Sequence, residues 1–256
     1  MGRSWNWGRL LGAAAILALV PTLAQAYSFL QTPSGVSLNW ATAPIPYYVG
    51  PLSSDLPEEA QVNAIQSAAQ TWADALDVEV LFEYRGRTDV AESSNDDLNV
   101  IFFQQSGWDP SSAAIATTHS YAVESGLMKG FDIPINDANY TFSTSEVPEE
   151  IQTDLENSMV HEFGHVLGLG HSNDPDATMY ASTQVGDLLK RDLAEDDMMG
   201  IWALYPEGIA FMAEGTMYGC ACVDDGTGLD QAGSVGAVLL GAFAIIGLRL
   251  RRRRRS

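Results

Sequence analysis

The feature that most constrains this chain is a pair of histidines four residues apart, His161 and His165, with a third, His171, six residues further on. Residues four apart lie on the same face of a helix, so His161 and His165 can both reach one metal ion. Gly168 allows the backbone to turn after the helix and to bring His171 back as a third nitrogen ligand. The spacing predicts a helix, a turn and a zinc site whose fourth position is left for water.

Glu162 stands beside the first of these ligands and is the candidate catalytic base. A bound zinc ion lowers the pKa of water to roughly 7, so that Glu162 can take a proton from it and later return the proton to a departing amine. Three of the four histidines in the chain fall within the motif. Chance is therefore a weak alternative to a metal site.

The stretch from His161 to Met179 resembles the metzincin metalloproteases. The run His-Glu-Phe-Gly-His-Val-Leu-Gly-Leu-Gly-His-Ser, followed by Asp174-Pro175, resembles the matrixin branch in particular. The resemblance implies that a protein or peptide is the substrate and that its peptide bonds are hydrolysed. It also implies that Met179, in the Met-turn of residues 177–180, forms an apolar floor beneath the metal ligands.

The resemblance continues on both sides of the motif. Residues 115–119 and 132–136 resemble the strands that border the substrate cleft of the family, and residues 193–205 resemble its final helix. The similarity covers roughly Trp40 to Tyr205. It implies an α+β fold of the metzincin type, with a twisted mixed sheet, an antiparallel edge strand, an active-site helix and a small C-terminal subdomain that ends in a helix.

Hydrophobic patterns predict secondary structure independently of this resemblance. Strands are expected at 44–49, 78–84, 98–103, 113–121 and 130–135. The third of these is almost continuously apolar, as in a strand covered on both faces. Helices are expected at 57–76, from near Pro148 to Val166, and at 193–204, and the chain beyond them is expected to be irregular. This order indicates a mixed sheet backed by helices.

Three departures from the matrixin pattern limit what the resemblance implies. Only His119 precedes the motif, so the second, structural zinc of animal matrixins is not expected. We interpret His119 as a polar strand residue near the cleft, with metal ligation as the alternative. No cysteine precedes Cys220, so latency through a zinc-bound cysteine is not expected. Ala181-Ser182-Thr183 replaces the usual proline-containing wall, so the pocket preferences of the family do not transfer.

The N-terminus has the pattern of a secretory signal peptide. A basic region precedes an apolar run from Leu10 to Val20, and Ala24-Gln25-Ala26 supplies small residues at the cleavage positions. We therefore expect residues 1–26 to be removed and the mature protein to begin at Tyr27. An uncleaved membrane anchor is the alternative, but the run is shorter than the ~20 residues that a helical span needs.

The C-terminus, residues 219–256, has the pattern of a sorting or anchoring tail. Cys220 and Cys222 come first, and an apolar segment (233–248) and an arginine cluster (249–255) follow. This order resembles the MYXO-CTERM sorting signal of myxobacterial surface proteins, which implies processing near a cysteine and retention at the cell surface. The alternatives are an ordinary C-terminal membrane anchor and, with less support, a basic tail that binds nucleic acid.

The order of the terminal segments agrees with export, and the charge of the chain bears on its partners. Arginines that follow an apolar segment tend to stay in the cytoplasm, which would leave the preceding domain, residues 27–218, on the outer side of a membrane. The formal net charge of the chain is −20, and most of its 13 basic residues lie in the two terminal segments. A domain with this excess of acidic residues would repel a polyanion, which argues against nucleic acid as a partner. We expect a monomer at the cell surface or in the extracellular space.

The leading interpretation is a zinc metalloendopeptidase with one catalytic ion on His161, His165 and His171 and with Glu162 as the base. The alternative is a surface adhesin in which zinc is only a structural staple. Glu162 favours the enzyme, because a staple needs no base and a closed site needs a fourth protein ligand. Calcium stays open, since no loop has the dense alternating carboxylates that mark a calcium site.

Overall fold

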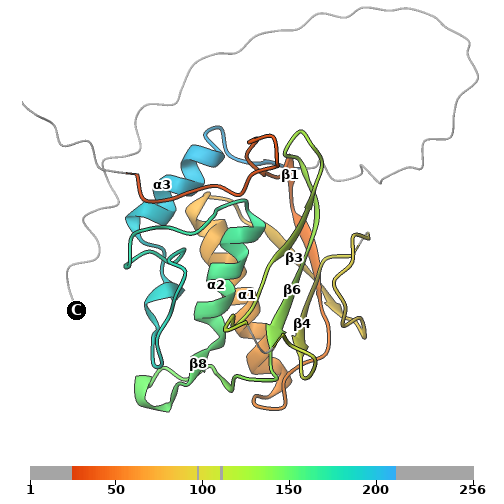
Figure 1. The fold of residues 1–256 in the computed structure, drawn as a ribbon, viewed down its shortest axis with the longest axis vertical. Coiled ribbons are helices and arrows are strands. Elements are labelled where there is room, and N and C mark those ends of the chain that lie inside the picture. The colour runs from red at the N-terminus through yellow and green to blue at the C-terminus, as the bar shows by residue number, and fades with distance from the viewer. Residues whose placement is uncertain (1–24, 97, 110–111, 212–256) are drawn as a thin grey trace, which may run out of the picture. The chain divides into compact units, whose positions relative to one another are not determined.

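The computed structural model describes residues 25–96, 98–109 and 112–211, drawn in colour in Figure 1. The expected signal peptide, apart from its last two residues, and the whole of the expected tail lie outside the described residues, so both stay predictions. Within the described part, no helix combines the length and the apolar character that crossing a membrane requires.

A five-stranded sheet forms the centre of the fold, with the strand order β3-β2-β4-β6-β5. Neighbours in the first four strands pair in parallel, and β5 pairs antiparallel with β6 at the edge. The strands are β2 (Ile45–Val49), β3 (Phe82–Arg87), β4 (Val100–Gln104), β5 (His119–Ala122) and β6 (Met128–Asn136). The predicted mixed sheet with an antiparallel edge strand is thereby confirmed.

Strand β4 lies in the middle of this sheet, between β2 and β6. Its first four residues, Val100 to Phe103, are all buried. A strand with neighbours on both edges and side chains covered on both faces needs apolar residues at every position. The continuous apolar run in the sequence predicted correctly that this strand is covered on both faces.

The part of the chain that the structure describes contains three α-helices beside the sheet: α1 (Glu58–Ala75), α2 (Leu155–Val166) and α3 (Glu195–Leu204). Figure 1 shows α1 and α2 side by side along the sheet. Trp72 of α1 is fully buried and donates a hydrogen bond of 2.8 Å from Nε1 to the carbonyl oxygen of Val160 in α2. Phe163 of α2 packs against Phe82 of β3, with ring centroids 4.5 Å apart. The apolar face of α2 is thus held by α1 and by the sheet.

The predicted start of the second helix is wrong, because α2 begins at Leu155 and not near Pro148. The residues before it form a 3₁₀ turn, η1 (Pro148–Glu150), and a short strand, β8 (Thr153–Asp154), which pairs in parallel with β7 (Phe142–Ser143). The side chain of Asp154 accepts a hydrogen bond of 2.7 Å from the backbone N–H of Asn157. This cap starts the helix at Leu155.

Other boundaries also differ from the prediction. Strand β3 begins at Phe82 instead of residue 78, because its pairing with β2 starts at Phe82, opposite Ile45, and residues 78–81 lie outside this ladder. Between residues 112 and 118 only Ala116 pairs with β6, through a single bridge to Ile135. The segment after α3 is not wholly irregular, since β9 (Ala210–Phe211) pairs in parallel with β1 (Thr42–Ala43).

Candidate metal centre

The structure brings the three histidines of the motif together. His161 and His165 lie on consecutive turns of α2, and His171 lies in the loop that follows the helix. One nitrogen from each ring lies within 4.8 Å of the others, and the ring centroids are 4.8 to 5.3 Å apart. Three imidazoles from a helix and its following loop form a donor set that suits zinc with one open position.

The return of His171 depends on a tight turn at Gly168. Its φ is +102°, and a Cβ atom there would lie 2.1 Å from the carbonyl oxygen of Leu38. Glycine is therefore required both by the backbone conformation and by the close approach of another chain segment. The loop is then held by Ser28, whose hydroxyl donates a hydrogen bond of 2.7 Å to the carbonyl oxygen of His171.

Backbone carbonyl groups orient two of the rings. Nδ1 of His161 lies 2.7 Å from the carbonyl oxygen of Thr178, and Nδ1 of His165 lies 2.8 Å from that of Leu169. A carbonyl oxygen can only accept, so Nδ1 carries the proton in both rings and Nε2 keeps its lone pair. This is the tautomer in which Nε2 can bind a metal, and such outer hydrogen bonds hold ligand rings in place.

Desolvation also favours the neutral form of the three rings, most of all for His161, while His171 is the most exposed of them. Burial lowers the pKa of His161 well below its usual value and lowers the pKa of His165 and of His171, because desolvation disfavours the charged imidazolium. The neighbouring rings and the Lys190 ammonium act in the same direction. Neutral imidazole is the form that ligates metals.

Glu162 lies beside the histidines with only 6% of its surface exposed. Burial raises the pKa of its carboxyl group to about 7, although a hydrogen bond from Thr118 opposes the rise. The Thr118 hydroxyl donates to Oε2 of Glu162 over 2.6 Å, and it also lies 3.1 Å from the backbone carbonyl oxygen of Glu162. The carboxylate is thus held from the segment that precedes β5. Sequence reasoning placed Thr118 at the cleft border but missed this contact.

Met179 packs beneath the helix turn that carries the histidines. It is 1% exposed, and a Cβ atom added to Gly164 of α2 would lie 2.3 Å from its sulfur. The methionine therefore occupies the space that a side chain at Gly164 would take. The sequence contains the small Gly164 and the large Met179, but only the fold shows that these two residues lie against each other.

Asp197 holds the Met-turn in place and was not singled out as a site residue from the sequence. It is 1% exposed in α3, and its Oδ1 accepts a hydrogen bond of 3.0 Å from the N–H of Met179. Its Oδ2 accepts bonds of 2.7 Å from the N–H of Thr178 and 2.9 Å from the N–H of Ala194. A buried carboxylate with three backbone donors ties the Met-turn to the last helix.

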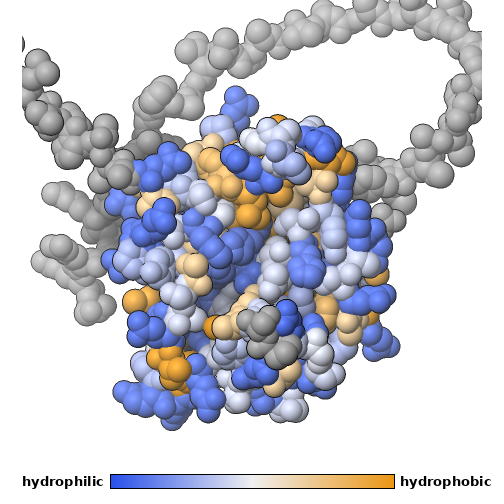
Figure 2. Space-filling model, in the orientation of Figure 1, coloured by the Kyte–Doolittle hydropathy of each residue, from blue (hydrophilic) through white to orange (hydrophobic). Residues whose placement is uncertain are grey.

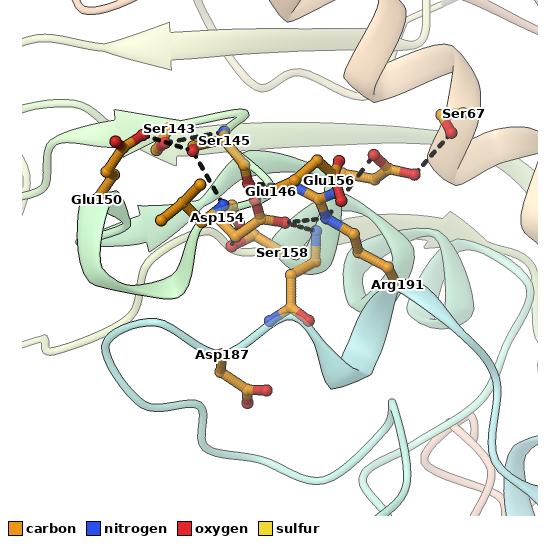
Figure 3. A network of polar contacts seen from close by, with 12 residues as sticks. Ser67, Ser143, Ser145, Glu146, Glu150, Asp154, Glu156, Ser158, Asp187 and Arg191 are labelled. Carbon is orange, nitrogen blue, oxygen red and sulfur yellow. Dashed lines mark hydrogen bonds and ion pairs between the residues drawn. The ribbon is translucent and has the colours of Figure 1, made fainter.

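Arg191 connects the loop after the Met-turn to the start of α2, as Figure 3 shows. It lies in the 3₁₀ turn η2 (Leu189–Arg191) and forms two hydrogen bonds, of 2.5 and 2.8 Å, with the fully buried carboxylate of Asp154. It also pairs with Glu146 over 2.5 Å. Asp154 is the N-cap of α2, so this pairing positions the histidine helix relative to the loop.

A cavity of about 780 Å³ opens in front of the three histidines and Glu162. Figure 2 shows that the visible face of the molecule is hollowed and that hydrophilic residues predominate around the hollow. The cavity is bordered by the cleft segment 113–118, by the first turns of α2 and by the loop 181–185 together with Lys190. Its size suits a few residues of an extended peptide.

His119 does not join the cluster formed by the other histidines. It is exposed on β5, where it pairs with Asp132 of β6. Among the described residues, the only group of metal-ligating side chains that close on one point is that of His161, His165 and His171. The interpretation of His119 as a polar strand residue agrees with this position.

The fold and the grouping of the three histidines are those of the metzincin class. The sequence profile of the matrixin peptidases matches residues 39–206, and the chain belongs to the matrixin family. This match covers the whole sheet, the three α-helices and the loop of the Met-turn.

Several curated relatives show the same similarity. The chain is 27% identical to matrix metalloproteinase-C of Caenorhabditis elegans over 73% of its own length and 32% of that protein. It is 31% identical to macrophage metalloelastase of Oryctolagus cuniculus over 65% of its length and 33% of that protein. It is 26% identical to neutrophil collagenase of Homo sapiens over 69% of its own length and 35% of that protein. The chain spans about a third of the length of these relatives.

Membership of this family supports a metalloprotease and implies a catalytic zinc ion. The residues present fit that metal, because three neutral imidazoles converge and two of them keep Nε2 unprotonated. The family also makes a non-catalytic adhesin the less favoured alternative.

Proposed function

We propose that this protein is a zinc metalloendopeptidase that hydrolyses peptide bonds in extended segments of protein substrates. The observation that carries the proposal is the convergence of three histidines and the buried Glu162 on one cavity. His161, His165 and His171 would hold the metal through their ring nitrogens. When bound, zinc supplies Lewis-acid chemistry that polarises the scissile carbonyl group and makes water more acidic.

Glu162 is the group that moves the proton. Its Oε2 accepts the hydrogen bond from Thr118, which leaves Oε1 as the oxygen that takes a proton from the attacking water. The same oxygen then delivers the proton to the nitrogen of the departing amine. A pKa near 7 suits both steps, because the group can hold and release a proton at neutral pH.

The cleft segment offers a backbone edge to the substrate. In the bridge between Ala116 and Ile135, the N–H of Thr117 donates to Pro134 and the carbonyl of Ile115 accepts from Asn136. In such an antiparallel bridge, the N–H and C=O groups of Ala116 itself point away from β6. Ala116 lines the cavity, so an extended substrate can add to this edge by backbone hydrogen bonds.

The organisation of the whole chain is part of the same proposal. Residues 1–26 would direct export, residues 27–218 would form the catalytic domain, and residues 219–256 would attach the protein to the outer surface or be processed there. A collagenase and a metalloelastase are among the curated relatives, and these names are consistent with an enzyme that acts on proteins outside the cell.

The test is casein cleavage by the purified protein beside its Glu162→Gln variant, with zinc measured in both. We expect the parent to cleave casein at least about 10³-fold faster than the variant, and we expect both proteins to contain zinc. Glutamine keeps the size of the side chain but cannot accept the proton. Equal cleavage by the two proteins would refute the role of Glu162, and zinc without cleavage in either would favour the adhesin.

A further inference from the structure

One end of the cavity is lined by polar side chains that the proposed chemistry does not use. Asn157 lies one turn before His161 on the same face of α2, and Thr183 faces it from the loop after the Met-turn. Lys190 lines the same cavity from η2. These three residues, here called the polar subsite, line the same cavity as Glu162 and the histidines, so they are the candidates to receive a substrate side chain next to the scissile bond.

A chain of hydrogen bonds determines which atom of Asn157 is free. The carboxylate of Asp187 can only accept, so the Thr183 hydroxyl donates to it over 2.9 Å. Thr183 therefore accepts from Nδ2 of Asn157, over 3.2 Å. Oδ1 of Asn157 is buried and has no hydrogen-bond partner among the described residues. A buried acceptor without a donor is unfavourable, so a ligand that donates to Oδ1 on entering this end of the cavity would remove that penalty.

Lys190 supplies the complementary donors. It is 7% exposed, and its Nζ donates one hydrogen bond to the carbonyl oxygen of Tyr180. An ammonium group has three N–H donors, so further donors remain for a ligand. The carboxylates of Asp187, Asp197 and Glu162 already act on this ammonium. A fourth carboxylate would meet their repulsion, and a cationic side chain would meet that of Lys190.

We propose that the polar subsite selects a carboxamide side chain, glutamine or asparagine, on the substrate residue beside the scissile bond. The carboxamide oxygen would accept from Nζ of Lys190, and its NH₂ group would donate to Oδ1 of Asn157. A neutral group that both donates and accepts can satisfy both partners, and a carboxamide does so through two separate atoms. This inference rests on the proposed peptidase function and specifies its substrates.

The experiment compares quenched fluorescent peptides that differ at one residue beside the scissile bond, varied on either side of it. The full-length protein is assayed with the near-isosteric pairs glutamine and methionine, and asparagine and leucine, and with glutamate. We expect kcat/KM to be at least about tenfold higher for the carboxamide peptide than for its apolar counterpart in each pair. The same factor is expected for glutamine compared with glutamate. A preference for methionine or leucine, or for glutamate, on both sides of the bond would overturn the proposal.

Two variants assign the preference to the polar subsite. Asn157→Ala removes the free acceptor, and Lys190→Met removes the donors but keeps the aliphatic chain. In each variant, kcat/KM for the glutamine peptide should come within about threefold of kcat/KM for the methionine peptide. Leu189→Ala is the matched control, because Leu189 is 75% exposed in the same turn as Lys190, and it should keep the ratio of the parent. An unchanged ratio in both test variants would overturn the assignment.

A third variant covers the case in which the others fail to fold. Thr183→Val removes the hydroxyl that orients Asn157 and should lower the same ratio while zinc content and melting temperature stay close to the parent values. If the parent cleaves no peptide and no casein, the peptidase function itself has failed. If the parent cleaves casein but does not discriminate within the pairs, only the inference about selectivity has failed.

Discussion

The hydroxyl group of Thr118 donates a 2.6 Å hydrogen bond to Oε2 of Glu162, so the cleft segment and the histidine helix are joined at the proposed base. The two residues are 44 positions apart in the sequence. A carboxylate with one oxygen held in this way has fewer orientations available, and its other oxygen is the one left to act as the proposed base.

Replacing Thr118 by valine tests this relationship. Valine has the same shape without the hydroxyl, so we expect kcat to fall by about 5- to 30-fold while KM and zinc content change little. Steady-state kinetics on one peptide substrate measure both constants. Thr118→Ser keeps the hydroxyl and should retain most of the activity. A rise in KM with kcat preserved would instead show that Thr118 contacts the substrate.

Gly164 should not tolerate a methyl group. Alanine at this position would place Cβ 2.3 Å from the sulfur of Met179 and 2.8 Å from Cζ2 of Trp72. We expect Gly164→Ala to lower the free energy of unfolding by about 1–3 kcal/mol and to weaken zinc binding, since the helix turn with the histidines must shift. Adding Met179→Ala should recover part of the loss, because it makes room. Denaturant titration of the single and double variants measures the coupling.

Arg191→Met should destabilise the protein through Asp154. This substitution leaves the fully buried Asp154 carboxylate without its cation, for which we expect a loss of about 3 kcal/mol in the free energy of unfolding. Glu146→Gln is the matched control, since Glu146 contacts the same arginine but is 81% exposed, and it should cost less than about 1 kcal/mol. Similar losses in both variants would contradict a special role for the buried pair.

The metal content should depend on the three motif histidines and not on His119. We expect one zinc ion per protein, a loss of zinc in His171→Ala, and an unchanged content in His119→Ala, which removes an exposed histidine of the edge strand. Elemental analysis after dialysis measures this. Chelator treatment should abolish cleavage, and added zinc should restore it. Loss of zinc in His119→Ala would reveal a second site.

Much of the fold was predictable because its signals are local. The continuous apolar run of β4 predicted a strand covered on both faces, and the three- and four-residue spacing in α1 predicted a helix over almost the observed range. The start of α2 was not predictable in this way, because residues 148–154 have a helical composition. Their pairing with β7 and the cap at Asp154 depend on contacts with Phe142, Ser143 and Arg191.

The same division applies to the site. The sequence by itself determined the grouping of the histidines with Glu162, since the positions of His161, Glu162 and His165 follow from helix geometry and that of His171 from a turn at Gly168. Only the tertiary structure decided how Thr118 contacts Glu162, how Asp197 binds the Met-turn and how Asn157 comes to lack a donor. The physical reason is that these contacts join segments far apart in the chain, and their hydrogen bonds form only when packing of the core brings those segments together.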